Sequence, residues 1–345
     1  MKKTFLAAAL YKHNQPLKII KDLKIPKPSP NQILAKILYS GLCGSQIAEI
    51  KGHRDDKKYL PHLLGHEGYA EVISVGKNVT KIKLGDKIIL SWIKGRGKES
   101  GGHKYNYSNT IINSGPISTF SDYSLISENR CFKAPQGINP KLAVLFGCAL
   151  PTGLGMIINE LKPRLNKSII LFGLGGVGFS ALIALLAFKP RNLVVVDKKD
   201  KNFFLKKINR NITFLKYQKY INYYIRSNNG NYYDYAIDCS GESSVTSLAF
   251  KILKPQGKMI FASHPKKSKK IIIDPYELIC GKKICGSWGG GSKLDTDIEK
   301  FYQLHKKKII KLNLLKTKIY KLSNINRAVK DMQKGKIIRA ILKHF

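Results

Sequence analysis

Two cysteines and one histidine, each next to a glycine, are the residues of this sequence best suited to chemistry. Cys43 lies in Gly-Leu-Cys-Gly-Ser, His66 in Gly-His-Glu-Gly and Cys148 in Phe-Gly-Cys-Ala-Leu-Pro-Thr-Gly. Two thiolates and one imidazole are the protein ligands of an open catalytic zinc site, whose fourth position is left for water or substrate. Taken singly, such cysteines are more often small buried side chains. The three together predict a catalytic zinc site.

A glycine-rich turn follows an apolar strand shortly after Cys148. The pattern G-x-G-x-x-G is formed by Gly173, Gly175, Gly176, Val177 and Gly178. In a βαβ unit the first glycine permits the tight turn, the second lets the backbone approach a pyrophosphate, and the third lets helix and strand pack closely. An Ala/Leu-rich helix follows, and Asp197 ends the next strand 19 residues after Gly178. This context predicts a dinucleotide site, and a glycine-rich turn in some other α/β protein is the alternative.

Asp197 bears on the choice between NAD and NADP. Its carboxylate would accept hydrogen bonds from the adenosine ribose hydroxyls and repel a 2′-phosphate, which favours NAD. Lys198 and Lys199 follow directly, and these cations could partly accommodate that phosphate. We therefore expect NAD, with NADP left open.

Composition sets the class of protein. A chain of 345 residues with 43% hydrophobic residues is long enough for two ordinary globular domains. The apolar run near Met1 stops after about six residues, below the length of a secretory signal, and the apolar stretch at 183–188 is far shorter than a membrane span of ~20 residues. Six cysteines without a paired framework fit a reducing compartment. We expect a cytoplasmic protein that does not cross a membrane.

The charge balance is extreme, with 61 basic residues against 22 acidic ones and a net charge of +39. Such a charge would ordinarily point to nucleic acid. Only nine of the basic residues are arginines, and the lysines are spread along the whole chain without a stripe that could read bases. We interpret the charge as surface composition with no specific nucleic-acid site. A protein that binds polyanions weakly and in a salt-sensitive way stays an alternative.

The pattern of strands and helices changes once along the chain. Residues 1 to about 145 show short β-rich runs broken by turns, such as 33–39, 70–75 and 87–92, which predict a mostly antiparallel domain. From about 150 to 288 apolar strands alternate with helices, which predicts a parallel sheet covered on both faces. Two amphipathic helices, at 297–305 and 324–334, and a strand at 337–343 follow. The predicted domains are 1–149 completed by 289–345, and 150–288.

Further motifs accompany the three candidate ligands. They are Gly76, Gly85-Asp86-Lys87, Thr152-Gly153-Leu-Gly155 and, near the end of the chain, Gly-Lys-Ile-Ile-Arg339-Ala-Ile-Leu. In this order the motifs resemble the zinc-containing medium-chain dehydrogenase/reductase family, which is alcohol dehydrogenase-like, and the resemblance covers essentially the whole chain. It implies an α/β protein with a β-rich GroES-like catalytic domain and a doubly wound Rossmann domain that binds the dinucleotide.

The resemblance also assigns roles at the metal. It implies that Cys43, His66 and Cys148 hold the zinc. Glu67 would lie behind the metal as an occasional alternative ligand, and the hydroxyl of Ser45 would bind the substrate oxygen and pass its proton onward.

Three further positions follow from the resemblance. Trp92 would form an aromatic wall of the substrate pocket, although a plain core aromatic is about equally expected. Thr152 would lie near the nicotinamide, and Arg339 near the pyrophosphate.

The sequence departs from the family pattern in three places. The family's structural zinc lobe carries four closely spaced cysteines, whereas residues 91–115 contain none, so we expect one zinc per chain. Gln46 stands where an aspartate usually orients the zinc-bound histidine, and an amide lacks the charge that raises ligand basicity. Ala48 replaces a frequent relay histidine, so the proton would leave through Glu49, His53, His62 or water. For His53 and His62, however, a role as simple loop histidines is the expectation.

These observations predict an enzyme. The expected reaction is reversible hydride transfer between a small-molecule alcohol, such as a simple alcohol, polyol or sugar derivative, and NAD(P), with zinc as Lewis acid. The family resemblance implies a homodimer or homotetramer. A zinc-independent reductase of quinones or activated alkenes on the same fold, and a non-enzymatic polyanion-binding protein, are the alternatives.

Overall fold

The computed structural model describes residues 4–54, 57–206, 208, 212–218, 233–263, 265 and 269–345. The chain separates into two compact units. The first comprises Met1–Ala149, Lys293–Tyr302 and Thr317–Phe345, and the second comprises Leu150–Ser292 and Gln303–Lys316. The sequence-based division differs from these units at 289–292 and 303–316. Residues 303–316 group with the second unit because the short helix η6 (Leu312–Leu314) packs on α4 (Gly176–Ala187).

The first unit is built on two sheets. One has the order β2 (Lys18–Lys24), β1 (Thr4–Leu10), β4 (His62–Leu63), β8 (Thr110–Asn113) and β7 (Lys104–Tyr107). The other has the order β10 (Cys131–Lys133), β6 (Lys87–Ser91), β5 (Glu67–Val75), β3 (Gln32–Leu42), β18 (Arg339–Lys343) and β17 (Thr317–Lys321), and β9 (Tyr123–Ser127) also pairs with β3. Most neighbours are antiparallel, as the sequence predicts; β4 with β8 and β17 with β18 are parallel.

Alternating apolar residues hold the larger sheet in register. Every second residue of β3 faces one side, and the side chains that meet there from β3, β5 and β6 are Ile33, Ala35, Ile37, Ala70, Val72, Ile88 and Leu90. Full burial of one such isoleucine or leucine contributes roughly 1.5–3 kcal/mol. A slip of one residue would move the whole set to the other face, so the pattern fixes which strand ends meet.

The end of the chain completes the first unit. Strand β18 lies between β3 and β17, and helix α10 (Ile325–Gln333) buries Ile325, Ala328 and Val329 against the core. The predicted helices at 297–305 and 324–334 correspond to α9 (Leu294–Lys306) and α10, and the predicted strand at 337–343 to β18.

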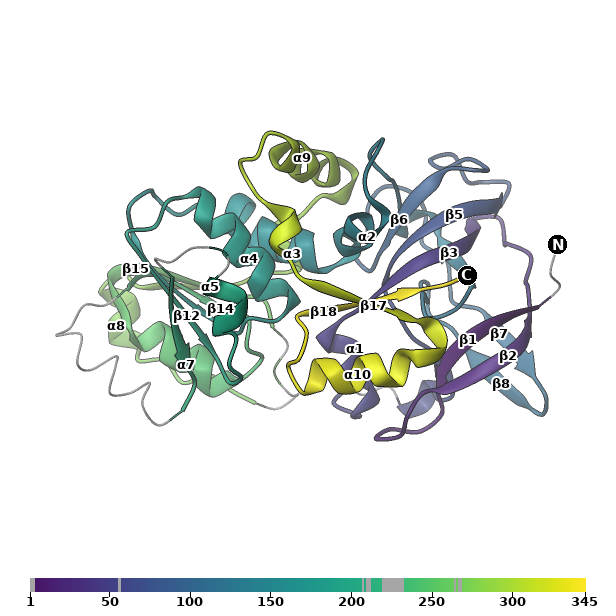
Figure 1. Cartoon of the computed structure of the whole chain (residues 1–345), viewed down its shortest axis with the longest axis horizontal. Helices are drawn as coiled ribbons and strands as arrows, with labels where there is room; N and C mark the ends of the chain where they lie inside the picture. The colour runs from purple at the N-terminus through teal and green to yellow at the C-terminus, as the bar shows by residue number, and fades with distance from the viewer. Residues whose placement is uncertain are drawn as a thin grey trace. The chain divides into compact units, whose positions relative to one another are not determined.

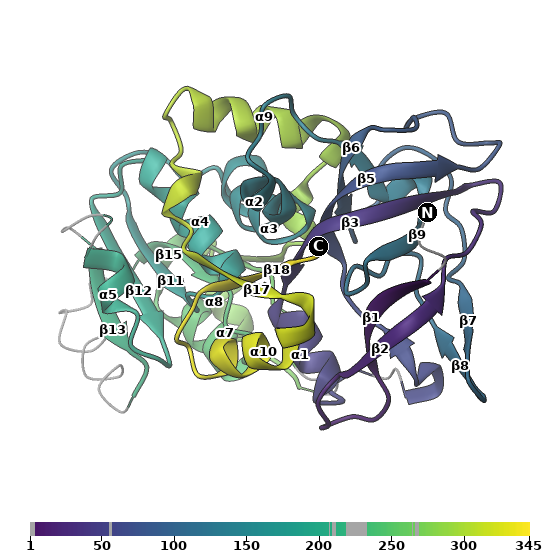
Figure 2. The ribbon, with the colours of Figure 1, turned by 45° about the vertical axis from the view of Figure 1, so that its right-hand side comes forward.

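The second unit contains a six-stranded parallel sheet. Its order is β13 (Ile212–Lys216), β12 (Asn192–Asp197), β11 (Ser168–Phe172), β14 (Tyr233–Asp238), β15 (Leu253–Phe261) and β16 (Lys283–Gly286). Numbered within the unit this is 3-2-1-4-5-6, the order of a doubly wound dinucleotide-binding fold. All strands are parallel, but β12 and β13 are added on one side of β11, whereas β15 and β16 are added on the other side of β14. Right-handed crossovers therefore place α4 and α7 (Ser243–Lys251) on opposite faces of the sheet, as Figures 1 and 2 show. The predicted fold class is confirmed.

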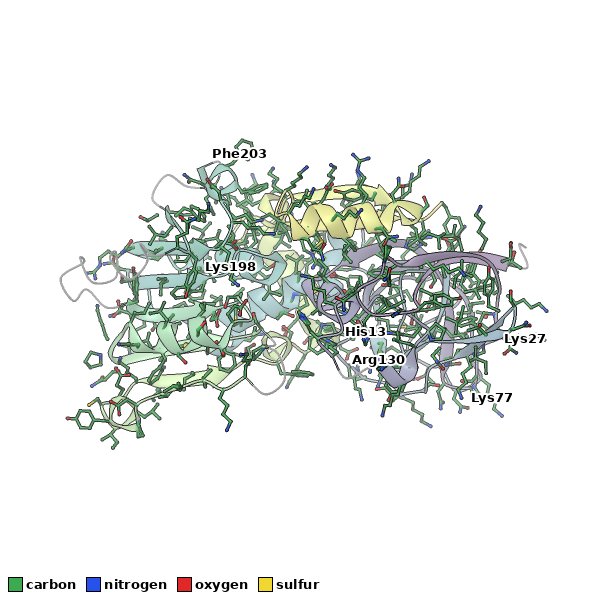
Figure 3. All side chains as sticks on the ribbon, turned by 90° about the horizontal axis from the view of Figure 1, so that it is seen from below. His13, Lys27, Lys77, Arg130, Lys198 and Phe203 are labelled. Atoms are coloured by element: carbon green, nitrogen blue, oxygen red, sulfur yellow. The ribbon has the colours of Figure 1, made fainter. Side chains whose placement is uncertain are left out.

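Charged side chains differ in how far they reach into solvent. The labelled side chains of Lys27 and Lys77 extend away from the ribbon, whereas that of Arg130 lies among other side chains (Figure 3).

Among the described residues no single helix is long and apolar enough to cross a membrane. The pair Pro140–Gly147 and Ala149–Leu161, bent by 64°, meets the criterion only when taken together, and most of its residues are buried.

Candidate metal centre and dinucleotide site

Strand pairing brings Cys43, His66 and Cys148 together in the first unit. Cys43 follows β3 and caps helix α1 (Gly44–Ile50), while His66 directly precedes β5, which is paired with β3. At the other edge of β5, Ser91 ends β6 and its hydroxyl donates to the carbonyl of Gly147, 2.7 Å away. Cys148 is therefore held beside the ends of these three strands. The two Sγ atoms are 3.8 Å apart, and the three possible ligand atoms lie within 4.8 Å of one another.

This geometry fits zinc. Two sulfurs bound tetrahedrally at about 2.3 Å from zinc are about 3.8 Å apart, as the Cys43 and Cys148 sulfurs are. Within the described part of the chain, the buried Nε2 of His66 has no hydrogen-bond partner. A buried ring nitrogen is costly without a partner, and a metal ion would supply one.

The two thiols influence each other strongly. A hydrogen bond from Cys148 holds the pKa of the Cys43 thiol well below its usual range, against the opposing effect of burial; His66 and the charge of Arg339 act in the same lowering direction. The same contact with Cys43, together with burial, raises the pKa of the Cys148 thiol. Cys43 is therefore the first of the pair to become a thiolate, the form that binds metal.

Trp92 contacts the candidate metal centre. Its indole donates a hydrogen bond to Cys148, which partly opposes the rise that Cys43 causes in the pKa of Cys148. The carbonyl oxygen of Trp92 accepts a hydrogen bond of 2.6 Å from Nη1 of Arg130, whose Nε in turn pairs with Glu99 at 2.9 Å. Trp92 is thus fixed at both its backbone and its ring, and its role as a pocket wall stays a prediction.

Glu67 and Arg339 form a buried ion pair next to the candidate ligands. Nη2 of Arg339 donates to Oε1 of Glu67, and the two side chains are 1% and 0% exposed. Space for Glu67 depends on Gly147, because a Cβ atom there would lie 2.7 Å from the Cβ of Glu67. Within the described residues, Oε2 of Glu67 and Nε of Arg339 have no hydrogen-bond partner. The structure gives Arg339 this carboxylate as its neighbour, and a pyrophosphate contact for Arg339 stays a prediction.

The candidate proton-transfer residues lie around α1. Oγ of Ser45 is buried and has no hydrogen-bond partner in the described chain. Nε2 of His62 is 3.8 Å from Oε1 of Glu49, whereas His53 is exposed. The structure therefore brings Glu49 and His62 together among the residues considered for proton exit.

The glycine-rich turn of the second unit follows β11 at the point where the strand order reverses. Gly173 adopts a φ of +82°, and a Cβ atom on Gly178 would collide with the carbonyl oxygen of Gly173. Gly175 instead borders open space, with no atom within 4 Å of an added Cβ. Gly176 and Val177 begin the buried helix α4. A helix N-terminus preceded by an open backbone is suited to a pyrophosphate.

Asp197, at the end of β12, is bound to this turn. Its carboxylate oxygens accept hydrogen bonds from the backbone N–H groups of Leu174, at 2.7 Å, and Lys199, at 2.8 Å. Lys198 pairs with Glu242 at 2.5 Å. Lys201 is buried nearby, and burial lowers the pKa of its ammonium group. Thr152 lies on α3 (Ala149–Gly155), where it is also buried.

Comparisons with known proteins find relatives of the alcohol dehydrogenase type. Residues 29–136 match the family model described as alcohol dehydrogenase GroES-like domain. The chain is 25% identical to S-(hydroxymethyl)glutathione dehydrogenase of Synechocystis over 97% of its own length and 98% of the relative. These matches support the resemblance to the zinc-containing medium-chain dehydrogenase/reductase family.

Solved structures of similar fold cover nearly the whole chain. The alcohol dehydrogenase zinc-binding domain protein of Burkholderia ambifaria has a TM-score of 0.86 at 25% identity and covers 99% of this chain and 98% of that one. Benzyl alcohol dehydrogenase of Acinetobacter calcoaceticus has a TM-score of 0.86 at 23% identity, with both chains covered to 100%. The latter likeness shows the fold.

Two carboxylates hold part of the segment that lacks cysteines in place. Glu128 accepts hydrogen bonds from the backbone N–H groups of Thr80 (2.7 Å), Lys81 (2.9 Å) and Lys98 (3.3 Å). Asp295 of α9 accepts from the backbone N–H of Arg96 at 2.8 Å and pairs with Lys81 at 2.6 Å. Glu128 and Asp295 were not predicted from the sequence, because a carboxylate that accepts backbone hydrogen bonds leaves no local motif.

Proposed function

We propose that this protein is a zinc-dependent oxidoreductase that transfers a hydride between a small-molecule alcohol and NAD(P). The observation that carries the proposal is the convergence of Cys43, His66 and Cys148, with an S–S separation of 3.8 Å that matches tetrahedral zinc. Relatives along the whole chain are alcohol and S-(hydroxymethyl)glutathione dehydrogenases, which supports an alcohol oxidoreductase. For the substrate we propose a simple alcohol, a polyol or a sugar derivative.

The proposed mechanism assigns separate tasks to this chain's residues. Cys43, His66 and Cys148 would hold the zinc, which acts when bound as a Lewis acid toward the substrate oxygen. Ser45 is the proposed relay for the substrate hydroxyl proton: its Oγ, which is buried and has no hydrogen-bond partner in the described chain, would accept that proton while its own proton passes on through Glu49, His53, His62 or water. Glu67 would lie behind the metal with its charge balanced by Arg339, while the glycine-rich turn orients the dinucleotide.

We propose NAD as the preferred cofactor. Asp197 places a carboxylate at the end of β12, and Glu242 engages Lys198, so that this cation is drawn toward another acid. A 2′-phosphate beside a carboxylate is repelled, and like charges placed together cost several kcal/mol. Asp197→Asn keeps the shape and removes the charge, so it should lower the preference for NAD over NADP by at least about tenfold in kcat/KM. An unchanged preference would mean that Asp197 does not select the cofactor.

The proposal extends to the number of zinc ions, the oligomeric state and the cellular location of the protein. We propose one zinc per chain, since residues 91–115 carry no cysteine and the carboxylates of Asp295 and Glu128 hold the backbone at Arg96 and Lys98. A homodimer or homotetramer and a cytoplasmic location are proposed from the family and from the free cysteines.

A substrate screen tests the proposed activity. Purified protein loaded with zinc is mixed with NAD and simple alcohols, polyols, sugars or S-(hydroxymethyl)glutathione, and NADH absorbance is followed. Turnover that a chelator abolishes and added zinc restores is expected. Reduction of quinones or alkenes by NADPH in the chelated protein would instead support the zinc-independent alternative.

A further inference from the structure

Gln46 connects the candidate metal ligand His66 to the cap of helix α1. Its side chain is buried, with 2% exposure. Oε1 of Gln46 accepts a hydrogen bond of 3.1 Å from the backbone N–H of Cys43. Nε2 of Gln46 forms a hydrogen bond with Nδ1 of His66. One amide side chain therefore contacts two of the three candidate zinc ligands.

The orientation of this amide follows from its partners. A backbone N–H can only donate, so the oxygen of Gln46 must face Cys43 and the NH₂ group must face His66. Nδ1 of His66 then accepts a hydrogen bond and carries no proton. In a neutral imidazole the proton consequently lies on Nε2, the nitrogen that is turned toward the thiols.

Zinc requires the opposite arrangement. A metal ion binds the lone pair of Nε2, so the ring proton must lie on Nδ1 and Nδ1 must donate. Two donors, the Cys43 N–H and the His66 Nδ1–H, then face an amide with one acceptor oxygen. If the amide turns toward His66, its NH₂ group meets the Cys43 N–H, and the cap hydrogen bond of α1 is lost.

We propose that Gln46 is a positioning residue that couples metal binding to the loss of the α1 cap hydrogen bond and thereby weakens zinc affinity. The proposal rests on the zinc site of the proposed function. In Gln46→Glu the side chain keeps its shape and offers two acceptor oxygens, one for each donor. Because each donor then has its own acceptor, zinc binding should tighten by about 10–100-fold, the usual range for a hydrogen-bond partner of a metal ligand.

The metal-free protein gives the first test. The nitrogen chemical shifts of the histidine rings, measured at pH 8 and assigned to His66 by comparison with His66→Asn, report which ring nitrogen carries the proton. In the wild-type protein the proton is expected on Nε2, and in Gln46→Glu on Nδ1. A wild-type His66 protonated on Nδ1 would overturn the proposal, whether or not the protein binds zinc.

Zinc affinity gives the second test, by competition with a chromophoric chelator. Gln32 provides a matched control, because it is also buried, accepts from the backbone N–H of Ser29 at 3.1 Å and donates to the carbonyl of Gly101 at 3.1 Å. Gln46→Glu should bind zinc at least tenfold more tightly than wild type, and Gln32→Glu should bind within about twofold of wild type. Gln46→Asp, which also offers two acceptors, replaces Gln46→Glu if that variant does not fold.

The outcomes separate this proposal from the proposed function. Equal zinc affinity in wild type and a folded Gln46→Glu or Gln46→Asp protein would overturn the coupling. An equal gain in Gln32→Glu would also overturn it, since added charge alone would then explain the effect. A wild-type protein that binds no zinc would remove the proposed function, while the His66 proton position still decides the role of Gln46.

Discussion

Glu67 and Arg339, 272 residues apart in the chain, form an ion pair that is almost completely shielded from solvent. Their contact joins the start of β5 to the start of β18, so the end of the chain closes the first unit next to the candidate ligands. Breaking a buried pair is costly, because the remaining charge stays buried without its partner.

Arg339→Met should therefore lower the free energy of unfolding by about 3–5 kcal/mol, as measured by urea denaturation. Glu71→Gln is the control, since Glu71 pairs with Lys87 at 2.8 Å on the exposed side of the sheet, where such pairs contribute about 0–1 kcal/mol. The double variant Glu67→Gln with Arg339→Met should recover part of the loss. Equal effects of Arg339→Met and Glu71→Gln would contradict the importance of the buried pair.

Two glycines of the dinucleotide turn should respond differently to alanine. Gly175 borders open space and Gly178 lies against the carbonyl of Gly173. Gly175→Ala should leave the unfolding free energy within about 0.5 kcal/mol of wild type but weaken NAD binding, because a methyl group then occupies the approach to the pyrophosphate. Gly178→Ala should reduce both the free energy of unfolding and the affinity for NAD. Calorimetric NAD titration and urea denaturation measure the two quantities, and unaltered NAD binding in Gly175→Ala would contradict the assigned site.

His344 should make stability depend on pH. It is 2% exposed, with Nε2 2.8 Å from Oγ of Ser40 and Nδ1 3.2 Å from Oδ1 of Asp122. Burial lowers the pKa of His344, with Asp122 acting in the opposite direction. The unfolded chain therefore takes up a proton at a higher pH than the folded protein does, so folding stability should fall as the pH drops below about 6.5.

The pH dependence is measured as the free energy of unfolding in urea between pH 5 and 8. His344→Asn should flatten the fall on the acidic side. His53→Asn, at an exposed position, should leave it unchanged. An identical slope in wild type and His344→Asn would contradict the contribution of His344.

Local signals made the fold and the candidate ligands predictable. Glycine neighbours mark Cys43, His66 and Cys148, and the alternation of strand and helix from Ser168 onward specifies the parallel sheet. The partner of each buried charge was not predictable. Contacts such as Glu67 with Arg339 or Lys81 with Asp295 join residues far apart in the sequence, and no local motif indicates which residues will meet. The same applies to Gln46, whose role depends on how its amide is oriented between Cys43 and His66.

The metal content of the purified protein shows whether Cys43, His66 and Cys148 hold a zinc ion. Zinc and protein are quantified in wild type, in Cys43→Ser and in Cys131→Ser, whose cysteine is buried in the core formed by β3, β5 and β6. A catalytic zinc site at Cys43 requires one zinc per chain in wild type and in Cys131→Ser, and a large loss of zinc in Cys43→Ser with NAD binding retained. Full zinc content or unchanged alcohol oxidation in Cys43→Ser would contradict it.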